Sequence, residues 1–479
     1  MKKIPFVGGS YIYDSLHFDA QRCVNWYPAR SESGTSRDEY ILMPTPGLLT
    51  FSELDDVGIR GQWEVNGRAF VVAGSTLYEL KANGTSLNRG TITTSSGNPV
   101  SISDNGFQLC IVDGTKTGGY ILDLTSNTFS QITDSYFLGA TNVVFLGGYF
   151  VFNKPDSGVY YISSLYDGLV GDASEFAVAE GCPDNLIAIY VLQNQLYLFG
   201  THTTEINAVD TSQNFPLSLI SGAFSEFGCS SPFAITSIMN AMFFIGQDKN
   251  GNSAVYQFNA YSPKKISTTP IDRKLSEYDL SQATAYSYQE EGHSFICFNA
   301  PTMPTTLVYD VTVDLWHERA FFNASSGEYS QHPGLFHTFA FGKHLIGDVV
   351  SNIVYEQSLN YNDYDGVRIR RMRTLPYILG SLNYVYFKKF QIDMETGVGL
   401  ESGADEDTDP QIFLDWSNDN ARTFSSGRTM SIGRVGEYAL RVISRMLGRA
   451  RARVFRVTTS TRARCYLVSC YIDAEEGSS

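Results

Sequence analysis

The sequence predicts an all-β protein, a β-propeller of six or seven blades joined to a β-sandwich-like platform domain. Three observations predict this fold: a hairpin motif that recurs along most of the chain, an aromatic content of 13%, and alternating apolar segments towards the C-terminal end. Aromatic and β-branched residues favour strands. A hydrophobic content of 43% is that of a globular protein with a sizeable core.

The hairpin motif is clearest from Arg68 to Leu80, where an apolar run meets a Gly74-Ser75 turn and a second run carries Tyr78. Seven copies occur, and their first strands begin near residues 69, 107, 149, 196, 242, 294 and 344. Repeats of roughly 40 to 50 residues, with about four short strands each, are typical of propeller blades. Because propellers often close by pairing strands from both ends of the repeat region, six and seven blades are both expected.

We expect three regions along the chain. Residues 1–55 lack the motif and form an N-terminal arm that belongs to the platform, residues 56–362 form the propeller, and residues 363–479 form the sandwich. Pro44 and Pro46 exclude a helix from the arm around Thr45. In the third region, five segments alternate well enough to be sandwich strands: Tyr384 to Met394, Gln411 to Trp416, Tyr438 to Met446, Arg453 to Thr459 and Cys465 to Ile472.

Three segments interrupt the repeats. Tyr166 to Pro183 and Thr211 to Pro232 are longer than ordinary hairpin connections, which favours functional or interface loops. Asp272 to Tyr286 is a helical candidate, with Leu275, Tyr278 and Leu280 loosely on one side.

Charge divides the chain into two parts of opposite sign. Residues 1–367 carry 18 Lys and Arg against 37 Asp and Glu, a net charge of −19, whereas residues 368–479 carry 17 against 13, a net charge of +4. Residues 422–464 hold eleven arginines and one acid, Glu437. We expect the propeller to repel nucleic acid and the C-terminal region to seek acidic surfaces.

The sequence shows no pattern of a catalytic or metal centre, and no cofactor is expected. A nucleophilic hydrolase needs a Ser or Cys beside a His, and neither that arrangement nor G-x-S-x-G is recognisable. His332, His337 and His344 have spacings that fit no zinc motif. The seven cysteines are scattered and predict buried free thiols: 23, 110, 182, 229, 297, 465 and 470.

Three polar segments resemble ligand sites but favour ordinary turns. Asp248 begins like a calcium loop, yet position twelve of that loop is Asn259 rather than Glu. The acidic run Asp405 to Asp409 favours a solvated loop. Ser417 to Phe424 resembles the Asp-box of sialidases, with Ala421 where Gly is usual, and that box is a hairpin turn rather than a catalytic site.

No apolar run approaches the roughly 18 residues that span a membrane. The start of the chain, Met1 to Pro5, is followed by Gly8-Gly9-Ser10 rather than by the apolar core of a signal peptide. We therefore expect a chain that is made in the cytoplasm and has no membrane span.

Several stretches in shared order resemble the packaged-DNA stabilisation proteins of short-tailed bacteriophages, also called tail hub or nozzle proteins. They run from Asn25-Trp26-Tyr27-Pro28 through Pro44 to Leu48, Ile59-Arg60-Gly61, Arg68 to Leu80, Ser417 to Phe424 and Gly433 to Tyr438 to the most specific stretch, Arg441 to Val457. The resemblance implies a non-enzymatic structural protein of the virion tail, made in the bacterial host. It implies a homo-hexameric ring below the portal and its adaptor protein, which anchors tail fibres or spikes. The ring would retain packaged DNA and form the exit channel through which DNA passes without sequence-specific binding.

The clustered arginines lack the lysines and interleaved aromatic residues of a nucleic-acid groove, and Arg is preferred for interface ion pairs. We therefore propose subunit or adaptor contacts at Arg368, Arg370, Arg371, Arg373, Arg441, Arg445, Arg449, Arg451 and Arg453. The alternative from another class is a glycan-binding or glycan-cleaving, sialidase-like propeller on the virion or cell surface, favoured by the Asp-box-like turn and the 29 Tyr.

Overall fold

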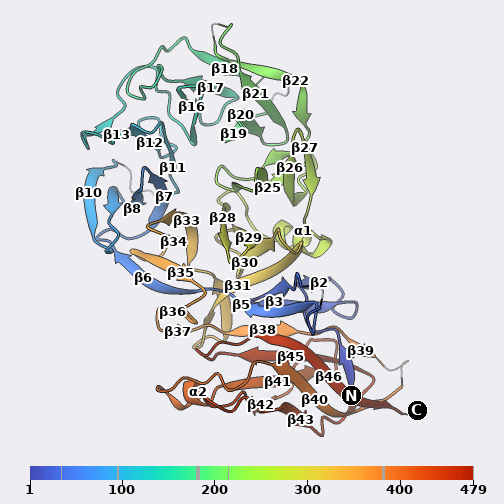
Figure 1. The fold of residues 1–479 in the computed structure, drawn as a ribbon. Coiled ribbons are helices and arrows are strands. Elements are labelled where there is room, and N and C mark those ends of the chain that lie inside the picture. Colours follow the sequence, from blue (N-terminus) through green and yellow to red (C-terminus); the bar gives the residue numbers. More distant parts are fainter. Residues whose placement is uncertain (34, 94–96, 180–183, 214, 380–382, 478–479) are drawn as a thin grey trace.

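A computed structural model describes residues 1–479 except 34, 94–96, 180–183, 214, 380–382 and 478–479. Cys182 and Pro183 therefore lie outside the described residues. The fold is all-β, as the sequence predicts, and Figure 1 shows a ring of small sheets above a layered sandwich. Two helices occur among the described residues, α1 (Thr269–Ser276) and α2 (Asp405–Thr408), and neither is long and apolar enough to cross a bilayer.

Each repeated hairpin supplies the second and third strands of a blade. In the first blade, β8 (Arg68–Ala73) and β9 (Thr76–Leu80) lie between β7 (Ile59–Val65) and β10 (Ser86–Thr91). Five further sheets follow: β11–β14 (Ser101–Asp104, Gln108–Val112, Gly119–Asp123, Phe129–Gln131), β15–β18 (Val143–Leu146, Tyr149–Asn153, Val159–Ile162, Phe176–Val178), β19–β22 (Leu186–Leu192, Gln195–Gly200, Thr204–Val209, Leu217–Ser225), β23–β27 (Gly228–Cys229, Ile235–Ile238, Ala241–Gln247, Ser253–Asn259, Ser262–Lys265) and β28–β31 (Thr284–Glu290, His293–Asn299, Thr306–Asp310, Leu315–Asn323).

The ring closes by pairing strands from both ends of the repeat region. β33 (Gly334–Ala340), β34 (Lys343–Asp348) and β35 (Ile353–Ser358) form the last sheet, and β6 (Gly47–Glu53) pairs antiparallel with β35 as its fourth strand. Seven successive blade sheets are thus present in the described residues. The seventh hairpin has a full blade because the expected arm, residues 1–55, ends in the strand that completes it.

Blades are buried on both faces, which explains why β8 reads as a continuous apolar run rather than an alternating one. Phe70 and Val72 pack with Ile102 and Ile111 of the next blade. Ala69, Val71 and Ala73 pack in the opposite direction, with Leu345 and Val354 of the last blade. Such a hairpin is marginal alone, so stacking between neighbouring blades supplies its stability.

The C-terminal region forms a sandwich of two sheets. One sheet has the order β4 (Trp26–Arg30), β5 (Tyr40–Pro44), β46 (Leu467–Glu476), β40 (Val385–Met394) and β43 (Val442–Arg445), with β1 (Lys2–Ile4) on β46 and β44 (Arg449–Ala450) on β40. The other has β3 (Ala20–Val24), β38 (Arg371–Thr374), β45 (Ala452–Thr459), β41 (Gln411–Ser417) and β42 (Arg428–Ser431), with β2 (Tyr11–Ile12) on β3 and β39 (Ile378–Leu379) on β45. Trp26, Phe390, Leu414, Phe455 and Ile472 belong to the core between them.

The arm joins the two parts. β3 pairs antiparallel with β38 of the sandwich and makes one parallel contact with β31 of the sixth blade, Val24 to Glu318. The buried Asn25 follows with a φ of 56°. Its side-chain amide donates to the carbonyls of Ala320 at 2.8 Å and Arg370 at 2.9 Å. One sheet therefore continues from propeller to sandwich.

The helix differs from the expected one. α1 begins at Thr269 and ends at Ser276, and residues 284–286 of the predicted segment lie in β28. Pro270 in the first turn favours an earlier helix start. The burial of Thr284, Tyr286 and Tyr288 at alternate positions is that of a strand, so the later part of the segment has the wrong period for a helix.

Candidate functional site

The nine arginines proposed as contacts separate by burial. Arg371, Arg373 and Arg453 are buried, with at most 2% of each residue exposed. Arg368 and Arg370 are half-buried. Four are exposed: Arg441, Arg445, Arg449 and Arg451. In this chain only the exposed and half-buried members are available to a partner.

Arg373 fastens the arm to the sandwich. Its guanidinium donates to the carbonyls of Phe6 and Gly9, each at 2.8 Å, and to Oε1 of Gln21 at 2.7 Å. Burial lowers the pKa of Arg373 and of its neighbour Arg371, whose Nη1 donates to the carbonyl of Thr461. These side chains hold distant segments of one chain together.

Arg453 supports the Asp-box-like turn. It donates to Oδ1 of Asn418 at 2.8 Å and to the carbonyl of Leu447 at 2.5 Å, and its guanidinium lies over the rings of Phe387 and Trp416. Burial lowers its pKa to about 10. The buried Arg453 therefore fixes the turn against the sandwich.

Asp419 stabilises the same turn from within. It accepts hydrogen bonds from Ser417 Oγ at 2.6 Å, from the backbone N–H of Thr423 at 2.9 Å and from Thr423 Oγ1 at 2.5 Å. Hydrogen bonds from Ser417 and Thr423 hold the pKa of this carboxyl well below its usual range. The carboxylate of Asp419 thus accepts hydrogen bonds from its own hairpin, as the sequence predicts for an Asp-box turn.

The exposed arginines lie in a segment that also exposes large apolar side chains, and we call residues 434–451 the basic segment. Tyr438 is 72% exposed and Met446 is 81% exposed, and Val435 and Leu440 are exposed as well. Among the residues that the structure describes, Arg441, Arg445, Arg449 and Arg451 form no ion pair. Arg, Tyr and Met together, without paired charges, are typical of protein–protein interface cores.

Sequence reasoning missed the apolar members of this segment because Tyr438 to Met446 reads as one strand. The strand β43 covers only Val442–Arg445, and Met446 follows it with a φ of 55°. A glycine two residues later, Gly448, was the available signal that the chain turns there.

One of the proposed arginines forms an ion pair with a member of the acidic run. Arg368 Nη1 and Nη2 donate to the two carboxylate oxygens of the buried Asp407, at 2.6 Å and 2.8 Å. Asp405 and Glu406, in the same helix α2, are exposed, and Glu406 also forms an ion pair with Arg368 at 3.6 Å. The run therefore combines internal ion pairs with outward-facing acids.

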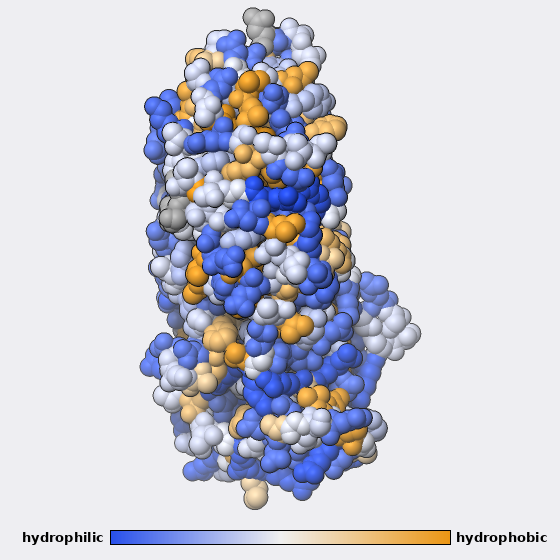
Figure 2. Space-filling model, turned by 90° about the vertical axis from the view of Figure 1, so that its left-hand side faces the viewer, coloured by the Kyte–Doolittle hydropathy of each residue, from blue (hydrophilic) through white to orange (hydrophobic). Residues whose placement is uncertain are grey.

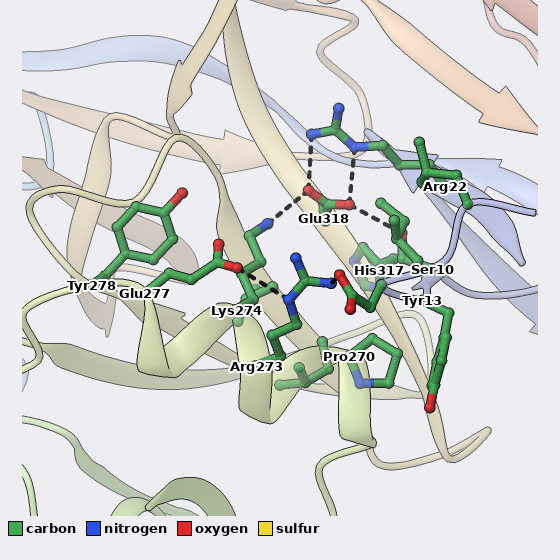
Figure 3. A pocket seen from close by; sticks show the side chains of 15 residues that line it. Ser10, Tyr13, Arg22, Pro270, Arg273, Lys274, Glu277, Tyr278, His317 and Glu318 are labelled. Carbon is green, nitrogen blue, oxygen red and sulfur yellow. Dashed lines mark hydrogen bonds and ion pairs between the residues drawn. The ribbon is translucent and has the colours of Figure 1, made fainter. Parts of the chain in front are cut away.

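A buried carboxylate links arm, propeller and helix (Figure 3). Glu318 on β31 is 2% exposed and accepts from Arg22 Nη2 at 3.0 Å, Lys274 Nζ at 3.1 Å and Thr305 Oγ1 at 2.9 Å. Burial alone would raise its pKa, but Arg22 and Lys274 hold that pKa well below its usual range. Beside it lies a cavity of about 380 Å³. Because its charges are paired, we read this cluster as a structural joint.

The propeller axis holds a cavity of about 460 Å³, lined by the innermost strands. Its walls include Val100, Ile102, Phe145, Ile189 and Val191, and Asp104 is the one charged residue among the described lining residues. This cavity is far too small for a DNA double helix, whose major groove alone is about 12 Å across.

The three histidines with closely spaced positions, His332, His337 and His344, are packed among aromatic rings and do not surround a common point. His337 Nε2 lies 3.0 Å from His344 Nδ1, and His332 accepts from the backbone N–H of Gly334 at 3.2 Å. Burial lowers the pKa of both His332 and His337 to about 3. No cluster of three or more His, Cys, Asp or Glu able to hold a metal ion occurs in the described part of the chain.

Two family models match the chain. The model described as Bacteriophage P22 Gp10, beta-propeller, matches residues 2–360, and the model described as Bacteriophage P22 Gp10, beta-sandwich, matches residues 371–475. A search of curated proteins found no match.

Solved structures resemble the chain only distantly. The computationally designed protein Ika8 matches at 12% identity and a TM-score of 0.40, covering 75% of this chain and 100% of its own. Virginiamycin B lyase from Staphylococcus aureus matches at 9% identity and a TM-score of 0.46, covering 65% of this chain and 99% of its own. Likenesses of this size carry no argument about activity.

Proposed function

The chain belongs to the bacteriophage P22 Gp10 family, and from this premise we propose that it is the tail hub, or nozzle, of a short-tailed phage. Membership makes it a phage structural protein associated with the virion. The proposal adds a homo-hexameric ring below the portal and its adaptor protein, an anchor for tail fibres or spikes, and a channel that retains packaged DNA and releases it on infection. It also assigns the protein no enzymatic role.

One observation carries the proposal: opposite charges are separated along the chain. Residues 1–367, which include the propeller, carry a net charge of −19, whereas the sandwich exposes arginines beside Tyr438 and Met446 that form no ion pair among the described residues. An acidic wall repels phosphates, so a DNA chain passes it without adhering. The basic segment has the composition of a binding surface and suits an adaptor with an acidic face.

The small size of the axial cavity supports a proposed DNA channel that runs between subunits rather than through one propeller. A duplex does not fit through a cavity of about 460 Å³, so the channel is formed by the outer faces of several propellers around a common axis. A closed ring of identical subunits provides such an axis. The arm and sandwich, joined by Asn25 and Arg373, form the platform of the ring.

The test mixes the purified protein with its adaptor and portal and measures the mass of the complex. Six chains of 53.1 kDa add about 320 kDa to the adaptor and portal. A ring of this mass supports the proposal, and the absence of any ring at micromolar concentrations contradicts it. A glycan array and a hydrolysis assay on the same sample address the sialidase-like alternative, for which we expect neither binding nor turnover.

A further inference from the structure

A second cluster of arginines, outside the basic segment, lines a cavity of about 360 Å³ where the arm, the sixth blade and the sandwich meet. Arg22 comes from the arm, Arg370 from the strand region before β38, Arg422 from the Asp-box-like turn and Arg456 from β45. No Asp or Glu is among the described lining residues. We call this cavity the arginine pocket.

Aromatic rings hold the guanidinium groups in place. The central carbon of the guanidinium lies over a ring in three of the four arginines: Arg370 over Phe322 at 4.2 Å, Arg456 over Phe424 at 3.7 Å and Arg22 over Tyr329 at 5.4 Å. Stacking of this kind pre-orients an arginine and reduces the entropy that it loses on binding a carboxylate.

The pocket keeps unsatisfied positive charge. Arg22 is paired with Glu318, and Arg456 is paired with Asp415. Arg370 and Arg422 have no ion pair among the described residues. The hydroxyl of Tyr329, which also lines the pocket, is buried without a hydrogen-bond partner in the described part of the chain. Two unpaired guanidinium groups and one free hydroxyl are the donors that a pair of carboxylates requires.

We propose that the arginine pocket binds the acidic run of a neighbouring copy of this chain, centred on Glu401, Asp405 and Glu406. These three acids are exposed, and they stand beside Leu400, which is 40% exposed. The pocket has apolar members to meet that leucine, Ile12 and Leu16. Acidic run and pocket therefore match in charge and in apolar surface.

The two partners lie at opposite ends of one strand. β41 begins just after α2 and ends at the Asp-box-like turn that carries Arg422. A strand of seven residues spans about 20 Å, and Figure 1 shows α2 at the left of the sandwich and β2, whose Ile12 lines the pocket, on the right. Two complementary surfaces at different places on one subunit form a head-to-tail contact between copies, which gives a ring where the rotation between neighbours closes.

This inference rests on the proposed ring, so its test is made first on the single chain. A labelled peptide of residues 398–410 is titrated into the full-length protein, and its fluorescence anisotropy reports binding. We expect saturable, salt-sensitive binding that weakens at least tenfold in Arg370→Gln/Arg422→Gln. Arg434→Gln/Arg464→Gln, which neutralises two exposed arginines elsewhere, should stay within twofold of wild type.

Arg422→Glu serves as a second pocket variant because its exposed side chain makes no described bond, so its fold should be intact. Equal affinity of the peptide for Arg422→Glu and wild type would overturn the inference. Binding of a duplex oligonucleotide in the pocket, with none of the peptide, would overturn it as well.

The ring assay then separates the inference from the proposed function. Glu401→Arg/Asp405→Arg should lose the ring, and combining it with Arg370→Glu/Arg422→Glu should restore it. If every variant forms rings as the wild type does, the proposed contact between the arginine pocket and the acidic run is refuted. The proposed nozzle function is then unaffected. If the peptide binds but wild type forms no ring with its adaptor and portal, the nozzle fails and the contact between copies stands.

Discussion

The Glu318 carboxylate and the Arg22 guanidinium form two hydrogen bonds across 296 residues of sequence, from Nε at 3.1 Å and from Nη2 at 3.0 Å. Together with Lys274 they connect three segments that are far apart in the chain: the arm, α1 and the sixth blade. The platform and the propeller thus share one charged joint, in addition to the sheet that runs through β3.

Removing the charge at this joint should destabilise the protein strongly. Glu318→Gln leaves Arg22 and Lys274 without their carboxylate partner in a buried site, and such losses cost about 3 to 5 kcal/mol. Chemical denaturation measures the free energy of unfolding. Glu277→Gln removes the exposed partner of Arg273 and should change it by less than about 0.5 kcal/mol. A similarly small change in the free energy of unfolding in both variants would contradict the structural role of Glu318.

The protein should lose stability in mild acid because buried histidines resist protonation. The folded pKa of His332 is about 3, whereas an unfolded histidine titrates near 6.5. The unfolded state therefore binds more protons between these values, and stability falls as the pH drops below about 6.5. At pH 5 this single group costs about 2 kcal/mol relative to pH 7.5.

His332→Asn removes that titration while offering an acceptor near Nδ1 for the N–H of Gly334. Urea denaturation at pH 7.5 and pH 5 should show a smaller loss of stability on acidification in the variant than in the wild type. An equal loss in both would show that His332 is not the group responsible.

The Asp-box-like turn should gain stability from the glycine that its motif usually carries. Ala421 has a φ of 62°, a left-handed conformation that is unfavourable for a residue with a Cβ. Ala421→Gly should raise the free energy of unfolding by about 0.5 to 1 kcal/mol. Ala439→Gly, in an exposed turn without positive φ, should instead be neutral or destabilising. A loss of stability in Ala421→Gly would show that the left-handed backbone of Ala421 is not strained.

Substitution of a buried arginine should lower stability, whereas substitution of exposed arginines should weaken adaptor binding. Arg373→Met leaves the carbonyls of Phe6 and Gly9 unsatisfied and should cost about 3 kcal/mol of stability. Arg441→Glu/Arg445→Glu should leave the melting temperature within a few degrees of wild type but abolish adaptor binding in a pull-down. Normal adaptor binding by that double variant would remove the basic segment from the proposed contact.

Local patterns predicted the blades well, and contacts between distant segments were out of reach. The hairpin from Arg68 to Leu80 is recognisable because its strands and its turn are adjacent in sequence. The pairing of β6 with β35 leaves no local signal, since any apolar strand from the arm could close the ring. Likewise, the sequence around Arg371 and Arg373 does not reveal that these side chains are buried. They donate hydrogen bonds there to backbone carbonyls of distant segments.

The most direct test of the account is a single-particle electron-microscopy structure of the protein with its adaptor and portal. We expect six copies in a closed ring, with the basic segment of each sandwich against the adaptor and the acidic propellers around a central channel. Propellers docked on the adaptor, or copies arranged without a common channel, would contradict it.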